Sequence, residues 1–521
     1  MSDSRRQTTV SDPPDPFREH YEVAIVGSGA GGATLAYGLS RRGRKVLLIE
    51  QGQFLPREAD NASEKGVFGR KYTTKERINI SGAEWNFPFH NYVGGQTKFY
   101  GAALYRFREA DFGRLDFPDG VSPAWPITYE DLEPYYLEAE RVYRVHGSAE
   151  EDPTEPPRSG PFPYPPVDHE PAVEPLLRGL QRQGLNVSSI PKAIDVRDGG
   201  DCHFCTTCDA YACPSGGKLD SEVACVRPAL ASGNLTLATE ARCERVVTNS
   251  GGERVVDLKV VHQGEVKGVS ADLYVLACDV VRSPAILLRS ANSAHPEGLA
   301  NSSGQVGRNL CGHNASWFFL PRIKPLPPLH QKTFAVNDYY LGADQHGFPL
   351  GTLQAAGRMP VWMQVPRWMA PFAKTINDRS ITCFGMSEVW PDPENRVHVD
   401  ADGMIHVDFR ANNVAGYHAL RRTFLRHFRR AGFPATISPR YQGAGLPWHP
   451  VGTLRFGSDP QTSVLDPWCR THDIENLYVV DSCFLPSAGA LNTSLTVMAQ
   501  ALRVAEHMDR RLGGRAEVDE A

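Results

Sequence analysis

A glycine-rich turn near the N-terminus is the first feature of this sequence that could bind a ligand. Gly27, Gly29 and Gly32 form a G-x-G-x-x-G pattern between a short apolar run and a helix-like run. Gly27 permits a tight turn, Gly29 lets the backbone approach a pyrophosphate, and Gly32 allows the helix to pack closely. Glu50 ends the next apolar run, where its carboxylate can accept hydrogen bonds from both ribose hydroxyls of an adenosine. The pattern predicts a dinucleotide site at the helix N-terminus, and we include Ala30 among its contacts.

Closely spaced cysteines form a second candidate site. Cys202, Cys205, Cys208 and Cys213 follow the spacing C-x2-C-x2-C-x4-C, with proline after the last cysteine. The run is similar to the ferredoxin pattern C-x2-C-x2-C-x3-C-P except for one extra residue. This difference leaves open an iron–sulfur cluster, a zinc site, and thiols that are uncoordinated or paired in disulfides. We favour neither metal.

The elements that position these residues come from distant parts of the chain. Apolar runs at 23–26 and 46–49 flank a helical run at 33–39, which predicts a β-α-β unit. Further strands are predicted within 235–277, where we expect Val247 to contact the cofactor, and at 476–481, where we expect Asp481 to do so. The cofactor domain therefore uses the beginning, the middle and the end of the chain. An amphipathic helix is also predicted at 417–430.

The composition excludes several classes of function. Among 521 residues, 55 are Lys or Arg and 60 are Asp or Glu, so the net charge of -5 lacks the basic excess of a nucleic-acid-binding protein. The polar first 20 residues lack the apolar core of a signal peptide, and we expect a cytoplasmic protein. The longest uncharged stretch, 482–502, contains Pro486, Asn492 and Gln500, so no membrane span is predicted.

Several ordered segments together resemble the glucose-methanol-choline (GMC) family of FAD-dependent oxidoreductases. They are the N-terminal β-α-β unit, the Gly-Gly loop at 91–101, the segment 283–290, and a C-terminal block at 449–457, 492–496 and 499–503. One signature is incomplete, because Ala291 and Asn292 stand where Ser-Gly usually continues. The resemblance covers almost the whole chain.

The resemblance implies an α/β fold with a Rossmann-like FAD-binding domain and an inserted α+β substrate-binding domain. We expect the FAD-binding domain at 21–110, 195–315 and 440–510, the substrate-binding domain at 111–194 and 316–439, and polar tails at 1–20 and 511–521. Gly94, Gly95 and Thr97 would lie against the flavin ring. Phe99 stands where some relatives carry a histidine bonded to the flavin, which implies a non-covalently held FAD.

The resemblance also assigns a catalytic pair, His449 and Asn492. A neutral imidazole is well matched to removing a hydroxyl proton near pH 7 while hydride leaves carbon for flavin N5. Asn492 can donate a hydrogen bond to the substrate oxygen, and we also expect it to cap a helix at 493–507. That helix, beginning at Thr493, would direct its N–H groups at the flavin.

The expected reaction is oxidation of a primary or secondary alcohol to a carbonyl compound. The substrate class that we expect is a sugar, a polyol or a glycosylated small molecule, and the electron acceptor (oxygen, a quinone or a protein) is left open. Two alternatives use the same fold without this reaction: a non-redox lyase such as a hydroxynitrile lyase, and a flavin-binding protein without catalysis. We read His313, within a further segment similar to the family, as structural.

Overall fold

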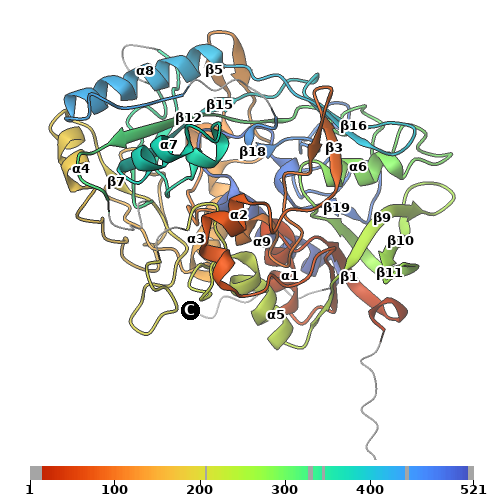
Figure 1. The fold of residues 1–521 in the computed structure, drawn as a ribbon. Coiled ribbons are helices and arrows are strands. Elements are labelled where there is room, and N and C mark those ends of the chain that lie inside the picture. Colours follow the sequence, from red (N-terminus) through yellow and green to blue (C-terminus); the bar gives the residue numbers. More distant parts are fainter. Residues whose placement is uncertain (1–14, 206–207, 327–331, 343–346, 440–444, 514–521) are drawn as a thin grey trace, which may run out of the picture.

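The first sheet is built around the β-α-β unit that the glycine pattern predicts. The computed structural model describes residues 15–205, 208–326, 332–342, 347–439 and 445–513. The unit is confirmed: β1 leads through the glycine turn into α1 and then β2, and both strands are parallel. The parallel part of the sheet has the order β8-β2-β1-β11-β19 (Figure 1). Its elements are β1 (His20–Val26), α1 (Ala30–Ser40), β2 (Val46–Ile49), β8 (Leu235–Ala238), β11 (Glu265–Leu276) and β19 (Leu477–Val479).

Strand β11 is 12 residues long, so its two halves can pair with different strands. Its C-terminal half pairs in parallel with β1 and β19, whereas its N-terminal half pairs antiparallel with β10 (Val255–His262), which continues to β9 (Ala241–Thr248). The strands predicted within 235–277 are therefore confirmed. A parallel sheet buried on both faces explains the apolar run of β2, whose residues are all buried.

Helix α1 packs closely against the C-terminal part of the chain because two of its residues are glycines without side chains. A Cβ at Gly31 would overlap the carbonyl oxygen of Val480, and a Cβ at Gly32 would overlap the carbonyl oxygen of Gly27. Helix α9 (Ser494–Arg511) packs on α1, and α3 (Tyr129–Val142) packs on α9. The residues just after β19 therefore lie directly beside the glycine turn.

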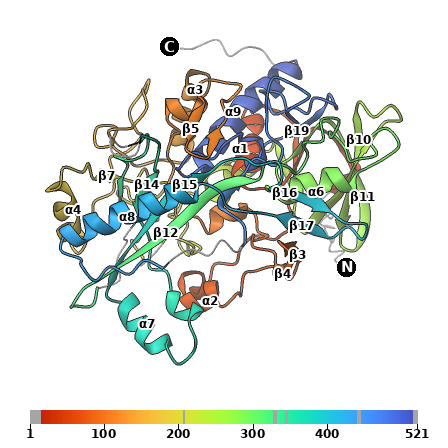
Figure 2. The same ribbon diagram turned by 90° about the horizontal axis from the view of Figure 1, so that it is seen from above.

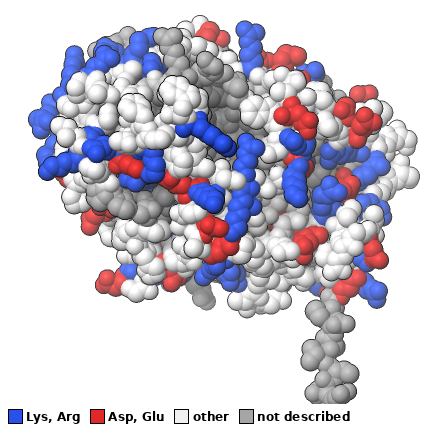
Figure 3. Space-filling view, viewed as in Figure 1, with Lys and Arg blue, Asp and Glu red and all other residues white. Residues whose placement is uncertain are grey.

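The second sheet is antiparallel and has the order β18-β12-β15-β14-β13-β7. One of its faces packs on α8 and α4 through Phe318, Cys383, Leu420 and Phe424, while α8 crosses it in the view of Figure 2. The predicted helix at 417–430 is confirmed as α8, and basic side chains gather along its outer edge in Figure 3. The elements are β7 (Ser188–Ser189), β12 (Cys311–Pro321), β13 (Phe334–Val336), β14 (Thr352–Ala355), β15 (Ser380–Val389), β18 (Trp448–Val451), α4 (Glu174–Gln181) and α8 (Val414–Arg430).

Smaller elements join segments that the predicted domain boundaries separate. The third sheet has the order β16-β17-β3-β4, so residues 77–86 pair with residues 396–408. Strand β18, from the segment 440–510, likewise pairs with β12 in the second sheet. The remaining elements are β3 (Arg77–Ile80), β4 (Ala83–Asn86), β16 (Arg396–Val399), β17 (Ile405–Asp408), the hairpin β5 (Leu115–Phe117) and β6 (Gly120–Ser122), α2 (Glu64–Phe68), α5 (Arg227–Ala231), α6 (Arg282–Arg289) and α7 (Ala370–Asn377). No helix in the described ranges is long and apolar enough to cross a bilayer.

We predict that Gly31→Ala destabilises the protein and that Gly29→Ala does not. The new methyl group at position 31 meets the backbone of Val480, which cannot move without shifting β19, whereas nothing lies within 4 Å of a Cβ at position 29. Overpacking of this kind costs about 1–3 kcal/mol. Thermal unfolding of both variants without added FAD measures the difference. Equal melting temperatures would contradict the tight contact.

Candidate active site

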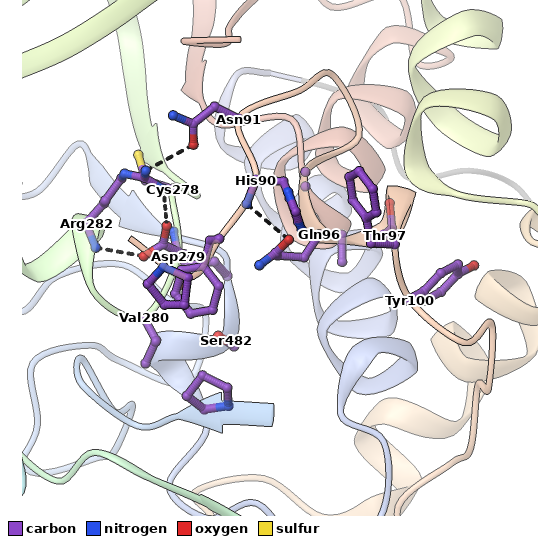
Figure 4. A pocket seen from close by; sticks show the side chains of 18 of the residues that line it. His90, Asn91, Gln96, Thr97, Tyr100, Cys278, Asp279, Val280, Arg282 and Ser482 are labelled. Atoms are coloured by element: carbon purple, nitrogen blue, oxygen red, sulfur yellow. Dashed lines mark hydrogen bonds and ion pairs between the residues drawn. The ribbon is translucent and has the colours of Figure 1, made fainter. Parts of the chain in front are cut away.

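A cavity of about 890 Å³ lies between the first and second sheets. Figure 4 shows the loop with His90, Gln96 and Thr97 on one side of it and the turn with Asp279 and Arg282 on the other. Arg282 ties these sides together, because it donates to Asn91 Oδ1 at 3.0 Å and to Asp279 Oδ2 at 2.8 Å. The catalytic candidates His449 and Asn492 line the same cavity as the glycine turn.

The glycine turn forms the end of the cavity that suits a dinucleotide. Gly27, Gly29 and Ala30 line it. The space beside Gly29 is open, and a Cβ at this position would reduce the room for a ligand. Gly32 packs against the strand instead. Glu50 also lines the cavity and accepts from the Ser28 hydroxyl at 2.6 Å. The carboxylate of Glu50 therefore lies in the cavity, with Ser28 donating to one of its oxygens, and its contact with a ribose stays a prediction.

The Gly-Gly loop is shaped by backbone conformations that favour glycine. Gly94 and Gly95 have φ values of 98° and 54°. Gly95 and Thr97 line the cavity, while Gly94 lies behind it and donates its N–H to Ser28 Oγ at 3.0 Å. Thr97 Oγ1 donates to the Gly94 carbonyl at 2.5 Å, which closes the turn. The loop and the glycine turn are thus bonded to each other.

The other predicted cofactor contacts divide into residues that line the cavity and one that does not. Asp481 and Thr493 line it, and Asp481 Oδ2 accepts from the Ser283 hydroxyl at 2.6 Å. Burial raises the pKa of Asp481. Val247 is not among the residues that line the cavity, and its contact with the cofactor stays a prediction. The part of β9 that reaches the cavity is the preceding stretch, which contributes Ala241 and Cys243.

His449 and Asn492 are brought together although 43 positions separate them. Asn492 Nδ2 lies 3.3 Å from His449 Nε2. Burial, followed by the neighbouring His313 and Lys332, lowers the pKa of His449 to about 3, so its ring is neutral at pH 7. The backbone of His449 has φ 46°, a left-handed conformation that is uncommon outside glycine and is found at functional sites.

The predicted cap by Asn492 is wrong. Helix α9 begins at Ser494 with Thr493 at its N-cap position, and no side-chain hydrogen bond caps it. The Asn492 amide is instead used in the cavity, where Oδ1 accepts from Gln354 Nε2 at 2.9 Å. The side chain of Asn492 therefore lies in the cavity and does not cap the helix.

Sequence reasoning missed the second histidine of this site. His313 Nδ1 lies 3.0 Å from His449 Nδ1, and burial lowers the pKa of His313 to about 4. The residue comes from β12, where His313 and Trp317 are separated by an even number of positions and so share one face. The alternation along β12 could have indicated that His313 lies on the same face as Trp317, because the opposite face, with Phe318, packs in the core.

A wall of aromatic rings stands beside His449. Trp317 lies opposite Phe384 in the strand register, with ring centroids 4.7 Å apart, and Phe384 lies 5.3 Å from Trp448. All of these rings line the cavity. The ion pair of the half-buried Asp209 and the buried Lys332, with 3.0 Å between carboxylate and ammonium, also lines it. None of these residues was identified from the sequence, because antiparallel pairing decides which of them meet.

The cysteine run at 202–213 is described in the structure except for residues 206–207. In the part of the chain that the structure describes, no disulfide is formed, so the disulfide alternative is wrong. No group of three or more His, Cys, Asp and Glu residues in that part is placed to hold a metal ion. Cys213 Sγ instead accepts from the backbone N–H of Lys218 at 3.4 Å. Burial opposes ionisation of Cys213, but this bond and one from Ser215 lower its pKa.

Comparison with known proteins places the chain in a family. Models of the GMC oxidoreductase N-terminal and C-terminal regions match residues 85–315 and 387–501, and a model of an NAD(P)-binding Rossmann-like domain matches residues 25–68. The 6'''-hydroxyparomomycin C oxidase of Streptomyces lividus is 30% identical, over 94% of this chain and 92% of its own length. The chain belongs to the GMC oxidoreductase family. It is an oxidoreductase that acts on CH–OH groups.

Other relatives of this GMC oxidoreductase cover it almost completely. The paromamine 6'-oxidase of Streptomyces fradiae is 29% identical over 93% of the chain and 91% of its own length. The 2-methyl-1,2-propanediol dehydrogenase of Mycolicibacterium austroafricanum is 28% identical over 94% and 95%, respectively. Among solved structures, pyridoxine 4-oxidase from Mesorbium loti matches with a TM-score of 0.65 and 21% identity, covering 94% of this chain and 99% of its own. The last match supports the two-domain fold alone.

The residues present fit FAD, the cofactor that GMC membership implies. The open space beside Gly29 leaves room for a pyrophosphate at the N-terminus of α1, and Glu50 lies where an adenosine ribose would bind. The cavity then continues past Gly95 and Thr97 to His449. A dinucleotide bound along this path would extend from the first sheet to the catalytic pair.

A buried acid close to this site predicts a pH-dependent stability. Glu388 lies opposite His313 in the register of β12 and β15 and accepts from the Ser122 hydroxyl at 2.9 Å. Burial raises its pKa from 4.5 to about 8. The folded protein therefore holds the proton that the unfolded chain loses above pH 4.5, and its stability falls as the pH rises toward 8 by about 1.4 kcal/mol per pH unit.

We therefore expect Glu388→Gln to raise the melting temperature at pH 7.5 and to change it much less at pH 5. The amide keeps an acceptor for Ser122 but cannot ionise, so the variant does not lose folding free energy as the pH rises. Differential scanning calorimetry at several pH values measures the difference in melting temperature, here called the gap, between the variant and the wild type. A gap that stays constant with pH would rule out a raised pKa at Glu388.

Proposed function

We propose that this protein oxidises a primary or secondary alcohol, with His449 removing the hydroxyl proton and Asn492 positioning the oxygen. The observation that carries the proposal is the 3.3 Å contact between His449 Nε2 and Asn492 Nδ2 within the cavity that also contains the glycine turn. FAD, when bound, supplies the acceptor for the hydride that leaves the carbinol carbon. Proton removal by a positioned base contributes about 10²–10⁴-fold to the rate.

The pair suits an alcohol because Asn492 Nδ2 can donate a hydrogen bond and His449 Nε2 can accept one. A substrate hydroxyl that lies within hydrogen-bond distance of both nitrogens can accept a hydrogen bond from Asn492 Nδ2 while it donates its own proton to His449 Nε2. The low pKa of His449 keeps the base available over the ordinary pH range.

We propose a sugar, a polyol or a glycosylated small molecule as the substrate. The rings of Trp317, Phe384 and Trp448 offer an apolar wall for the C–H face of such a molecule, and Asp209 and Lys332 offer polar partners for its hydroxyl groups. Relatives named as oxidases of 6'''-hydroxyparomomycin C and of paromamine support this substrate class.

A cytoplasmic location is proposed from the eleven cysteines, an odd number that does not suit a disulfide scaffold.

We expect His449→Ala to slow anaerobic reduction of the flavin by about 10²–10⁴-fold while FAD stays bound. Asn492→Ala should also slow it, and the double variant should lose less than the product of the single losses because both residues act on one oxygen. Stopped-flow absorbance with a panel of alcohols measures these rates, and His20→Ala, on the protein surface, is the control. A wild-type rate in His449→Ala would remove the base from the proposal. Turnover without bleaching of the wild-type flavin would favour a lyase.

We also propose that FAD is held without a covalent bond. Phe99 lines the cavity and stacks on His90, with ring centroids 3.9 Å apart. Acid precipitation of the yellow protein should therefore release FAD into the supernatant, where absorbance and mass spectrometry identify it. Colour that stays with the precipitate would contradict the proposal. His90, whose ring also lines the cavity, would then be the first residue to replace.

A further inference from the structure

We propose that His313 is a positioning residue that fixes the tautomer of His449, so that Nε2 is the bare nitrogen facing the substrate. The inference rests on the proposed function, in which His449 is the base. It is argued from a line of hydrogen bonds that runs from the backbone carbonyl of Ala488 through the rings of His313 and His449 to the cavity. The polarity of that line is decided at its buried end.

The buried end is the carbonyl oxygen of Ala488, which can only accept. His313 Nε2 lies 3.2 Å from it and must therefore carry a hydrogen. A neutral imidazole has one N–H, so His313 Nδ1 is a bare acceptor. His449 Nδ1, 3.0 Å away, must then be the donor between the rings. The proton of the neutral His449 ring is thereby placed on Nδ1, and its Nε2 is left bare.

The outer end of the line has the same polarity. A bare Nε2 on His449 requires a donor from Asn492, and Nδ2 lies 3.3 Å from it. Asn492 Oδ1 then accepts from Gln354 Nε2 at 2.9 Å. Every bond from Gln354 to Ala488 therefore points in one direction, and no reversed donor or acceptor is needed.

Burial keeps both imidazole rings neutral, so each ring carries a single N–H. His313 is 1% exposed, and burial lowers the pKa of both histidines. The acid opposite His313, Glu388, has a raised pKa and holds its proton at pH 7. Lys332 and Asp209, the charged groups nearest to His449, form an ion pair with each other. No buried charge therefore competes for the proton on His449 Nδ1.

The fold presents His313 to His449 through strand register. His313 on β12 pairs with Trp448 on β18, so His449 follows the residue directly opposite. The left-handed backbone of His449 turns its ring back toward β12 instead of away from it, and the two rings meet edge to face at 76°. Without an acceptor at this point, the proton of His449 would be free to occupy Nε2, where it would face the Asn492 N–H and leave no base.

Two variants of His313 separate this role from packing. Asn and Leu have nearly the same shape, but Asn Oδ1 reaches the position of the histidine Nδ1 and can accept, whereas Leu cannot. We expect His313→Leu to slow anaerobic flavin reduction by about 10–100-fold at saturating alcohol, with little change in KM. His313→Asn should stay within a few-fold of the wild type. Melting temperatures and FAD content of both holoenzymes are the controls.

Nitrogen-15 NMR of histidine-labelled holoenzyme tests the tautomer without turnover. The His449 signals are assigned by their loss in His449→Ala. In the wild type we expect a protonated Nδ1 and a bare Nε2, and in His313→Leu a shift of the proton toward Nε2. A wild-type ring protonated on Nε2 would overturn the inference, as would equal rates in the Asn and Leu variants. A bare Nε2 with full activity in His449→Ala would instead leave the tautomer intact and refute the proposed function.

Discussion

The contact between Gly31 and the carbonyl of Val480 is the constraint on which the rest of the structure depends. It allows α1 to lie against the strand end just beyond β19, and so brings the glycine turn beside the segment that leads to Asn492. A side chain at Gly31 would separate these parts. The end of the cavity at the glycine turn and the end that contains His449 and Asn492 are therefore placed by one backbone contact, and the loop around Gly95 lies between them.

The antiparallel sheet divides its two faces between stability and chemistry. Residues such as Phe318 and Cys383 point to one face and form a core with α8, whereas Trp317 and Phe384 point to the other and line the cavity. Because side chains alternate along a strand, a rigid core on one face fixes the positions of the residues on the other. Burial on the cavity side also explains why the imidazole of His449 is neutral.

Local patterns predicted the elements well, because the signals for them lie within short segments. The glycine turn, the strands within 235–277 and helix α8 follow from spacing and periodicity alone. The positions of His313 and Gln354 beside the catalytic pair depend on strand register over more than 100 positions, which a local pattern does not contain. Asn492 was misread as a cap for a similar reason, since its actual partners lie far away in the sequence.

The order in which the chain is made has a consequence for how β11 and α1 find their neighbours. Strand β19 pairs with β11 at one edge of the parallel part of the first sheet, and α9 packs on α1, yet both come after residue 476. At about 5–20 residues per second, a ribosome needs roughly 20–90 s to pass from β2 to β19. During that time the edge of β11 and the face of α1 have no permanent cover. The first sheet and its covering helices are therefore completed only late in synthesis, after β19 and α9 have been made.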